Sequence, residues 1–318
     1  MENKNRRQQN TLTGLLGELT EERTSGLAFS LATIVPYVLV LVFAIVCAVA
    51  GLMRDGVEQE DWYLYFSYLL PQLAFALVAV AYFKLTKNPI KTMLGKPKLM
   101  DFLLAIGLQF GLLSLGLLNG WFIEWLNGLG FTVTEPTIPS VDGFGLVGVL
   151  FVIAVLPAVF EEVLFRGILL KGLKGFPVWA AALLCGGMFS LFHQNPAQTL
   201  YQFFCGVAFA LIAIRSGSIL PTALAHFLNN ALIILSAKFS WNVYVLPILI
   251  DSAVCLVLSL AYLIVGFMKE KNEGAPTQTE SDAKIVSAKK TERKQFFLYA
   301  AAGLAICVIG WISGLFGG

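Results

Sequence analysis

Apolar runs of about eighteen residues or more, the length that spans a bilayer as a helix, recur along the whole of this chain. The composition agrees with this pattern, because 57% of the 318 residues are hydrophobic and only 13% are charged. An ordinary soluble protein carries about 25% charged residues. We therefore predict an all-α polytopic integral membrane protein with about nine transmembrane helices.

The nine predicted spans alternate with short polar connections. We place them at about 27–53, 62–85, 101–123, 144–170, 177–193, 199–214, 219–237, 243–268 and 296–316. The chain then divides into a polar tail, a membrane bundle with its chemistry in 144–237, a charged linker and one additional C-terminal helix. These four parts are 1–26, 27–268, 269–294 and 295–318.

The lysines and arginines orient this bundle, since cytoplasmic loops of membrane proteins carry an excess of them. Nineteen of the 22 fall on one side of the nine-span arrangement, and Arg54 and Lys238 fall on the other. We expect the N-terminus and the 269–294 linker in the cytoplasm, the 119–143 segment outside, and the plasma membrane as the location. The net charge of +2 is spread over loops, which predicts no nucleic-acid partner.

The five cysteines all lie inside apolar runs and form no close pair. This pattern fits neither a disulfide framework nor a thiolate zinc site. We expect them to be small packing residues.

Two carboxylates and a guanidinium interrupt the fourth span, in the stretch Glu161-Glu162-Val163-Leu164-Phe165-Arg166. Charges inside a membrane segment cost at least a few kcal/mol each unless they are paired or hydrated, and they mark functional sites by default. On a helix, Glu162 and Arg166 share a face at a spacing that allows an ion pair. Glu161 projects about 100° away. The spacing therefore predicts one held carboxylate and one free to act; a structural salt bridge is the alternative.

The only two histidines of the chain also lie in predicted spans. His193 ends the fifth span, one turn after Phe189, and His226 lies in the seventh, four residues before Asn230. Together with the carboxylates they are an inventory for general base catalysis with polarisation of a carbonyl. Equally, Glu161, His193 and His226 could ligate one zinc ion, with a fourth position left for water.

These motifs resemble those of a known family. Glu-Glu-x-x-x-Arg, Phe-x-x-x-His and His-x-x-x-Asn, in this order on successive spans, are similar to the motifs of the CAAX-protease and bacteriocin-processing (CPBP) family of intramembrane endopeptidases. The resemblance covers about 144–237. It implies an eight-helix CAAX-protease-like core, with the ninth span as an addition.

The resemblance also implies an activity. The protein would hydrolyse a peptide bond of a membrane-associated protein or peptide, with lipidated proteins among the candidates and with Glu161 as the general base that activates water. Glu162 and Arg166 would form the structural pair. The family is described both as metalloprotease and as metal-free, and we favour the metal-free form, because it uses each group once. Oligomeric state has no sequence signal.

The remaining motif residues take roles by the same resemblance. His193 would help to hold the water, and Phe189 would pack beside it in the substrate-binding region. His226 and Asn230 would stabilise the oxyanion, and Asn229 could replace Asn230 after a small rotation. Two other classes of function stay open: a non-catalytic scaffold or bacteriocin-immunity protein of the same fold, and a proton-coupled transporter.

One distance needs an explanation. At 1.5 Å per residue, His193 would lie about 24 Å from the cytoplasmic end of its span, whereas Glu161 would lie about 15 Å from that end. Upright helices would keep the two apart. Either the fifth helix tilts, or the Gln194-Asn195-Pro196 break lies within the membrane and lines a wet cavity; we favour the break.

Overall fold

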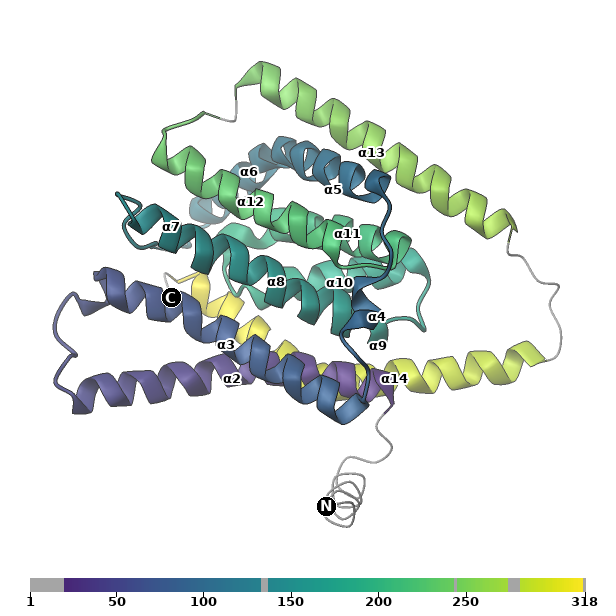
Figure 1. Cartoon of the computed structure of the whole chain (residues 1–318), viewed down its shortest axis with the longest axis horizontal. Coiled ribbons are helices and arrows are strands. Elements are labelled where there is room, and N and C mark those ends of the chain that lie inside the picture. Colours follow the sequence, from purple (N-terminus) through teal and green to yellow (C-terminus); the bar gives the residue numbers. More distant parts are fainter. Residues whose placement is uncertain (1–19, 133–136, 243–244, 274–280, 317–318) are drawn as a thin grey trace, which may run out of the picture.

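The computed structural model describes residues 20–132, 137–242, 245–273 and 281–316, and in these ranges the chain is built from helices (Figure 1). The helices that carry most of the chain are α2 (Glu21–Val49), α3 (Asp61–Thr86), α5 (Leu99–Leu112), α6 (Gly116–Gly128), α10 (Val178–Phe192), α11 (Thr199–Ser216), α12 (Leu220–Lys238), α13 (Leu246–Glu273) and α14 (Ser281–Gly314). The shorter pieces are η1 (Val57–Gln59), α4 (Lys91–Leu94), η2 (Leu113–Leu115) and η5 (Pro196–Gln198).

The fourth predicted span is one continuous helical rod with changes of pitch. It runs through α7 (Gly145–Val149), η3 (Leu150–Val155), α8 (Leu156–Glu162), η4 (Val163–Leu169) and α9 (Leu170–Gly172). Both η3 and η4 are π-helical, a rare geometry that is found mostly as single wide turns at functional sites. The Glu-Glu pair thus ends a short α-helical stretch between two wide turns.

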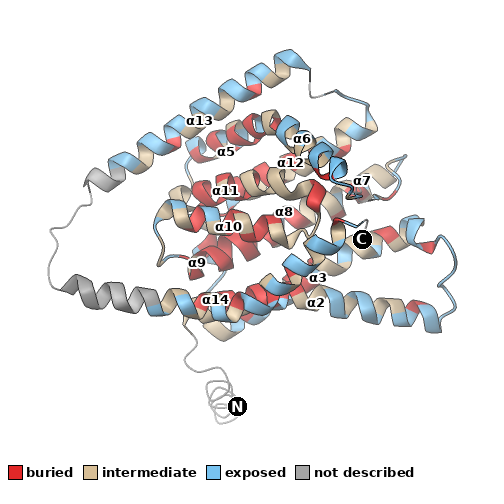
Figure 2. Cartoon of the chain, turned by 180° about the vertical axis from the view of Figure 1, so that it is seen from behind, coloured by how far each residue is buried: buried red, intermediate tan, exposed pale blue. Residues whose placement is uncertain are grey.

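Eight helical segments of the described chain are long and apolar enough to cross a membrane, and the 15-residue α10 is a shorter apolar helix. This confirms the all-α polytopic membrane protein. The fifth predicted span corresponds to α10, which is shorter than a spanning helix, so the number of nine spans stays a prediction. Figure 2 shows the burial pattern that a membrane protein needs. Buried residues concentrate on α8 to α11, while the outer faces of α2 and α13 are exposed.

The α8–α9 rod forms the centre of the bundle. Phe165 and Ile168 have no exposed surface, and they belong to a core cluster with residues of α2, α3, α10 and α11. On the outside, α14 packs along α2, and α13 packs along α5 (Figure 1). The charged residues of the rod, Glu161, Glu162 and Arg166, are therefore buried inside the bundle.

The chain breaks between α10 and α11, as predicted for Gln194-Asn195-Pro196. The helix α10 ends at Phe192, and Gln194 has a φ of 51°. The Asn195 side chain accepts a hydrogen bond from the Ala197 N–H at 2.8 Å, which caps η5 before α11 begins. The loop packs against Gly310 and Gly314, in the last turns of the α14 span.

Several predicted boundaries move. The helix α2 starts at Glu21, inside the predicted tail, and α14 starts at Ser281, inside the predicted linker. Residues 1–19 and 274–280, on which much of the tail and linker predictions rest, lie outside the described residues. The division of the chain into tail, bundle, linker and additional helix stays a prediction.

An ion pair lies at the end of the bundle opposite to the lysine-rich end. Lys238, the last residue of α12, lies 2.5 Å from Asp142 in the loop before α7. This hydrogen bond and the positive charge hold the pKa of Asp142 below its usual 3.8. Asp142 is exposed, so the pair contributes little to stability.

Candidate active site

The ion pair predicted from the Glu-Glu-x-x-x-Arg spacing is present. Arg166 Nη1 lies 2.6 Å from Glu162 Oε1, and neither side chain has exposed surface. Arg166 Nη2 donates to the Gly206 carbonyl of α11 at 3.3 Å, and the guanidinium lies 4.5 Å from the ring centroid of Phe189. A buried charge pair is tolerated only with such additional partners. Arg166 therefore joins the rod to α10 and α11.

Glu162 is also held by the third motif. His226 of α12 places Nδ1 2.9 Å from Glu162 Oε1. Because a carboxylate oxygen can only accept, Nδ1–H is the donor, and this fixes the orientation and tautomer of the ring. Glu162 is thus bound by both Arg166 and His226.

Glu161 is the less restrained carboxylate. Its Oε2 lies 3.9 Å from His226 Nε2, too far for a direct hydrogen bond but close enough for one water molecule to contact both groups. Among the described residues, this Oε2 has no hydrogen-bond partner, although it is buried. The sequence prediction of one held and one available carboxylate describes this arrangement.

The second motif meets the first through Phe189. Its ring lies 4.7 Å from the ring of His193 and 6.0 Å from that of His226, both edge-on. His193 Nδ1 donates to the Phe189 carbonyl at 2.8 Å, which leaves Nε2 available to a water molecule. Glu161 is near enough to interact electrostatically with His193. Phe189 therefore joins the two histidines in one cluster, and the explanation by a break within the membrane stays a prediction.

Phe189 itself is a packing residue. Only 1% of it is exposed, and its ring is surrounded by Arg166, Phe165 and the two histidines. This burial favours a packing role for Phe189, and its assignment to substrate binding stays a prediction.

The two asparagines after His226 belong to a polar network. Asn230 Nδ2 donates to the Ile153 carbonyl of η3 at 2.9 Å, and its Oδ1 accepts from Asn229 at 3.0 Å. Asn229 Oδ1 in turn accepts from Gln109 Nε2 at 2.7 Å and from the Tyr201 hydroxyl at 2.9 Å. Asn230, the less buried of the two asparagines, is held against the wide turn that precedes the Glu-Glu pair.

Gln109 and Tyr201 were not found by sequence reasoning. Gln109 lies on α5, outside the three motifs, and is 4% exposed. The sequence could have indicated Gln109, because a side-chain amide in the middle of a predicted span needs a hydrogen-bond partner. Tyr201 gives no such signal, since a tyrosine near the start of a span usually marks the membrane interface.

Comparison with protein families assigns the region that carries all three motifs. Residues 143–232 match the family model described as type II CAAX prenyl endopeptidase Rce1-like. We refer to this matched region as the Rce1-like domain. It runs from just before α7 into α12 and matches the family resemblance seen in the sequence. No match is found among curated proteins or among solved structures.

Helices that precede the Rce1-like domain in the sequence form hydrogen bonds with it. Gln109 on α5 hydrogen-bonds to Asn229 within the domain. Ser25 on α2 donates to the Ile168 carbonyl of the central rod at 2.9 Å. The family assignment supports a protease in a membrane, and the surrounding helices supply contacts to its site.

The residues proposed as zinc ligands were tested against this geometry. Within the described ranges, no group of three or more His, Cys, Asp or Glu side chains is arranged to hold a metal ion. Of the three candidates, His226 uses Nδ1 on Glu162, and His193 uses Nδ1 on a backbone carbonyl. Both histidines keep Nε2 free, and metal-bound histidines donate their other ring nitrogen in the same way, so the zinc site stays an open prediction. No step below involves a metal.

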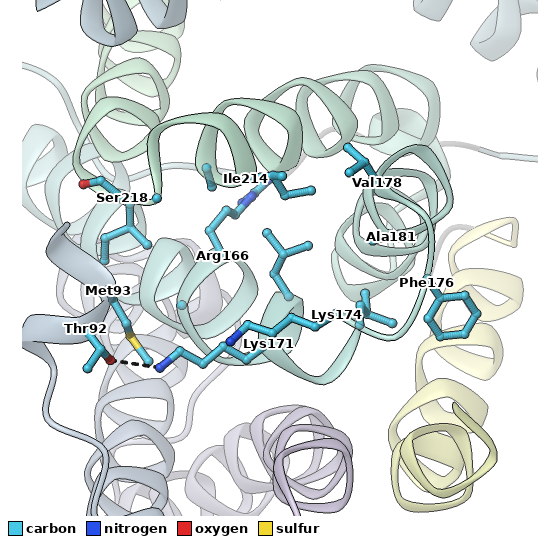
Figure 3. Close-up of a pocket in the computed structure, with 16 residues that line it drawn as sticks. Thr92, Met93, Arg166, Lys171, Lys174, Phe176, Val178, Ala181, Ile214 and Ser218 are labelled. Carbon is cyan, nitrogen blue, oxygen red and sulfur yellow. Dashed lines mark hydrogen bonds between the residues drawn. The ribbon is translucent and has the colours of Figure 1, made fainter. Parts of the chain in front are cut away.

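A cavity of about 370 Å³ lies on the lysine-rich side of the Rce1-like domain (Figure 3). The charged residues that line it are Arg166, Lys171 and Lys174, all cations, and the walls are mostly apolar. Lys171 Nζ donates to Thr92 Oγ1 at 3.0 Å (Figure 3). The cavity connects this end of the bundle with the guanidinium that holds Glu162.

Proposed function

We propose that this protein is an intramembrane endopeptidase that hydrolyses a peptide bond of a membrane-associated protein or peptide. One observation carries the proposal. Glu162 is bound through Oε1 by Arg166 and His226. In the part of the chain that the structure describes, Oε2 of the neighbouring Glu161 has no hydrogen-bond partner and lies 3.9 Å from His226 Nε2. A structural salt bridge would use a single carboxylate. Two adjacent buried carboxylates in different surroundings are a pattern of acid–base sites.

In this proposal Glu161 is the general base. A water molecule between Glu161 Oε2 and His226 Nε2 gives one proton to Glu161, and its oxygen forms a bond with the carbonyl carbon of the substrate. The carbonyl electron pair moves to the oxygen, which gives a tetrahedral intermediate. When the intermediate collapses, the C–N bond breaks, and Glu161 returns the proton to the leaving amine. A positioned acid–base group of this kind contributes about 10²–10⁴-fold in rate.

The oxyanion of that intermediate is stabilised by His226 and Asn230. His226 Nδ1–H donates a hydrogen bond to Glu162. Nε2 can therefore donate to the oxyanion only when the ring carries both protons. That form brings the charge of His226, Arg166 and the two glutamates to zero. Asn230 Nδ2 uses one hydrogen on Ile153 and has a second one to donate. Preorganised donors of this kind are among the largest contributions to catalysis.

His193 completes the water site. Its Nδ1–H donates to the Phe189 carbonyl, so Nε2 of the neutral ring accepts a hydrogen bond from the attacking water. The Glu161 carboxylate and the His193 ring then hold the two hydrogens of one water molecule. This directs an oxygen lone pair of the water toward the substrate.

The substrate class follows from the position of the site and from the family. The site is enclosed by membrane helices, so its substrate is membrane-associated. The matching family model carries the description of a prenyl endopeptidase. We therefore include lipidated proteins among the candidate substrates. We place the protein in the plasma membrane with a cytoplasmic N-terminus, because the Lys/Arg distribution favours that orientation.

The test is cleavage of a library of membrane-anchored peptides, with and without a lipid anchor, by the purified protein in phospholipid vesicles. Mass spectrometry of the products identifies the cleaved bond. The matched control is Glu161→Ala, which should give no product from any peptide that the unaltered protein cleaves. Equal cleavage by both proteins would overturn the role of Glu161. Absence of cleavage by the unaltered protein across the library would favour a non-catalytic scaffold.

A further inference from the structure

The loop that follows His193 has a strained conformation. Gln194 has a φ of 51°, a left-handed conformation that is uncommon for residues other than glycine. Such residues persist only where the surroundings fix them, and they cluster at functional sites. The N–H of Gln194 donates to the Leu191 carbonyl at 3.0 Å. Local hydrogen bonding therefore turns the chain sharply at the residue after His193.

Two helices outside the Rce1-like domain, α2 and α14, contact the Gln194 side chain. Tyr37 of α2 donates its hydroxyl hydrogen to Gln194 Oε1. Gly310 of α14 lies against the same side chain, so closely that a Cβ atom at this position would overlap Gln194 Oε1. Both contacts join sequence positions more than 100 residues apart.

The next turn of α14 holds the rest of the loop. A Cβ atom at Gly314 would lie 2.6 Å from Cδ of Pro196 and 3.1 Å from the Gln194 carbonyl oxygen. Trp311 Nε1 donates to Thr199 Oγ1 at 2.7 Å. Residues 310, 311 and 314 lie within about 100° of one another around α14, because 314 is four residues after 310 and three residues after 311. This side of the helix covers the loop from its first residue to the start of α11.

We propose that α14 is a positioning element of the active site: its Gly310–Gly314 face holds the 194–199 loop and thereby sets the position of His193. The inference rests on the proposed endopeptidase function. Within the described ranges, the His193 side chain has a hydrogen bond only to the Phe189 carbonyl of its own helix. The α10 helix ends one residue before it, so its distance from Glu161 depends on where the loop sits. The last helix of the chain, beyond the matched family region, then belongs to the catalytic apparatus.

The test compares two glycine-to-alanine variants on α14. Gly314→Ala pushes against backbone and proline atoms of the loop. Gly303→Ala creates a similar overlap, 2.8 Å from the Ser30 Cα of α2, but does not touch the loop. Both should lower the unfolding temperature. Only Gly314→Ala should lower kcat, by on the order of ten- to a hundredfold, with KM unchanged, because the substrate still binds.

A second measurement does not depend on activity. Hydrogen exchange of backbone amides in 193–199 should be faster in Gly314→Ala and in Trp311→Phe than in the unaltered protein, and unchanged in Gly303→Ala. Equal kcat and equal loop exchange in Gly314→Ala and Gly303→Ala would overturn the proposal. If the unaltered protein cleaved no peptide, the proposed function would fail, and the exchange experiment would still decide whether α14 holds the loop.

Discussion

Glu162 and His226 are joined by a hydrogen bond of 2.9 Å between a carboxylate oxygen and Nδ1, across two helices separated by 64 positions in the sequence. The same oxygen is bound to Arg166. The first and third motifs are therefore one unit in the structure, with Glu162 at its centre. Glu162 orients the histidine in the way that a buried carboxylate orients the histidine of a catalytic triad.

Glu162→Gln should destabilise the fold. The substitution leaves Arg166 buried without its counter-charge, a loss on the order of 3–5 kcal/mol in the free energy of unfolding. The thermal unfolding midpoint in detergent measures it. The matched control is Glu161→Gln, one residue away, which removes no ion pair with Arg166 and should unfold close to the unaltered protein. Equal midpoints for the two variants would contradict the division of roles.

The Gln109–Asn229 hydrogen bond should show strong coupling. Asn229→Leu leaves the buried amide of Gln109 without this partner, which should cost about 1–3 kcal/mol. Replacing both residues with leucine also removes the Gln109 amide, so this amide is no longer buried without its Asn229 partner, and the double variant should be less destabilised than the two single changes together. Free energies of unfolding for the four proteins measure the coupling. Additive effects would show that the bond in the structure contributes nothing.

The pattern of apolar runs was sufficient to predict the membrane bundle, and the spacing of Glu162 and Arg166 was sufficient to predict their ion pair. Both features are local, because helix periodicity alone decides them. The hydrogen bond between Glu162 and His226 was not predicted, since it depends on how α12 rotates against the central rod. The π-helical turns were also missed, because the apolar residues around them are compatible with ordinary α-helix.

The break after His193 was predicted from a disagreement between two depths in the membrane. The sequence carried the reason, since Gln194-Asn195-Pro196 is polar and ends in proline. The sequence could not show which residues hold the break. Gly310, Gly314 and Trp311 lie more than 100 positions later, and only the packing of α14 brings them to the loop. Gln109 was missed for the same reason.

The orientation of the bundle can be tested by cysteine labelling of intact cells. Lys174→Cys lies at the lysine-rich end, and Glu58→Cys lies at the opposite end, where both native side chains are exposed. We expect a membrane-impermeant reagent to label position 58 and not position 174. Cys255 is the one native cysteine that is not buried, so the experiment uses a Cys255→Ser background. Labelling of position 174 from outside would show that the predicted orientation is wrong.

Removal of metal should leave activity unchanged. The preferred mechanism uses Glu161 as base and keeps both histidines free of metal, which accounts for each polar group once. Prolonged chelation of the active, purified protein, followed by elemental analysis, tests this directly. Stoichiometric zinc whose removal stops turnover, and whose return restores it, would show that the mechanism is wrong.

The most direct test of the account is the cleavage rate of Glu161→Gln, measured in phospholipid vesicles on a peptide that the unaltered protein cleaves. Glutamine keeps the size of the side chain and removes its ability to take a proton. The account predicts a folded protein with an unchanged unfolding midpoint and a rate lower by on the order of 10²–10⁴. A folded Glu161→Gln protein that cleaves the peptide at the rate of the unaltered protein would contradict it.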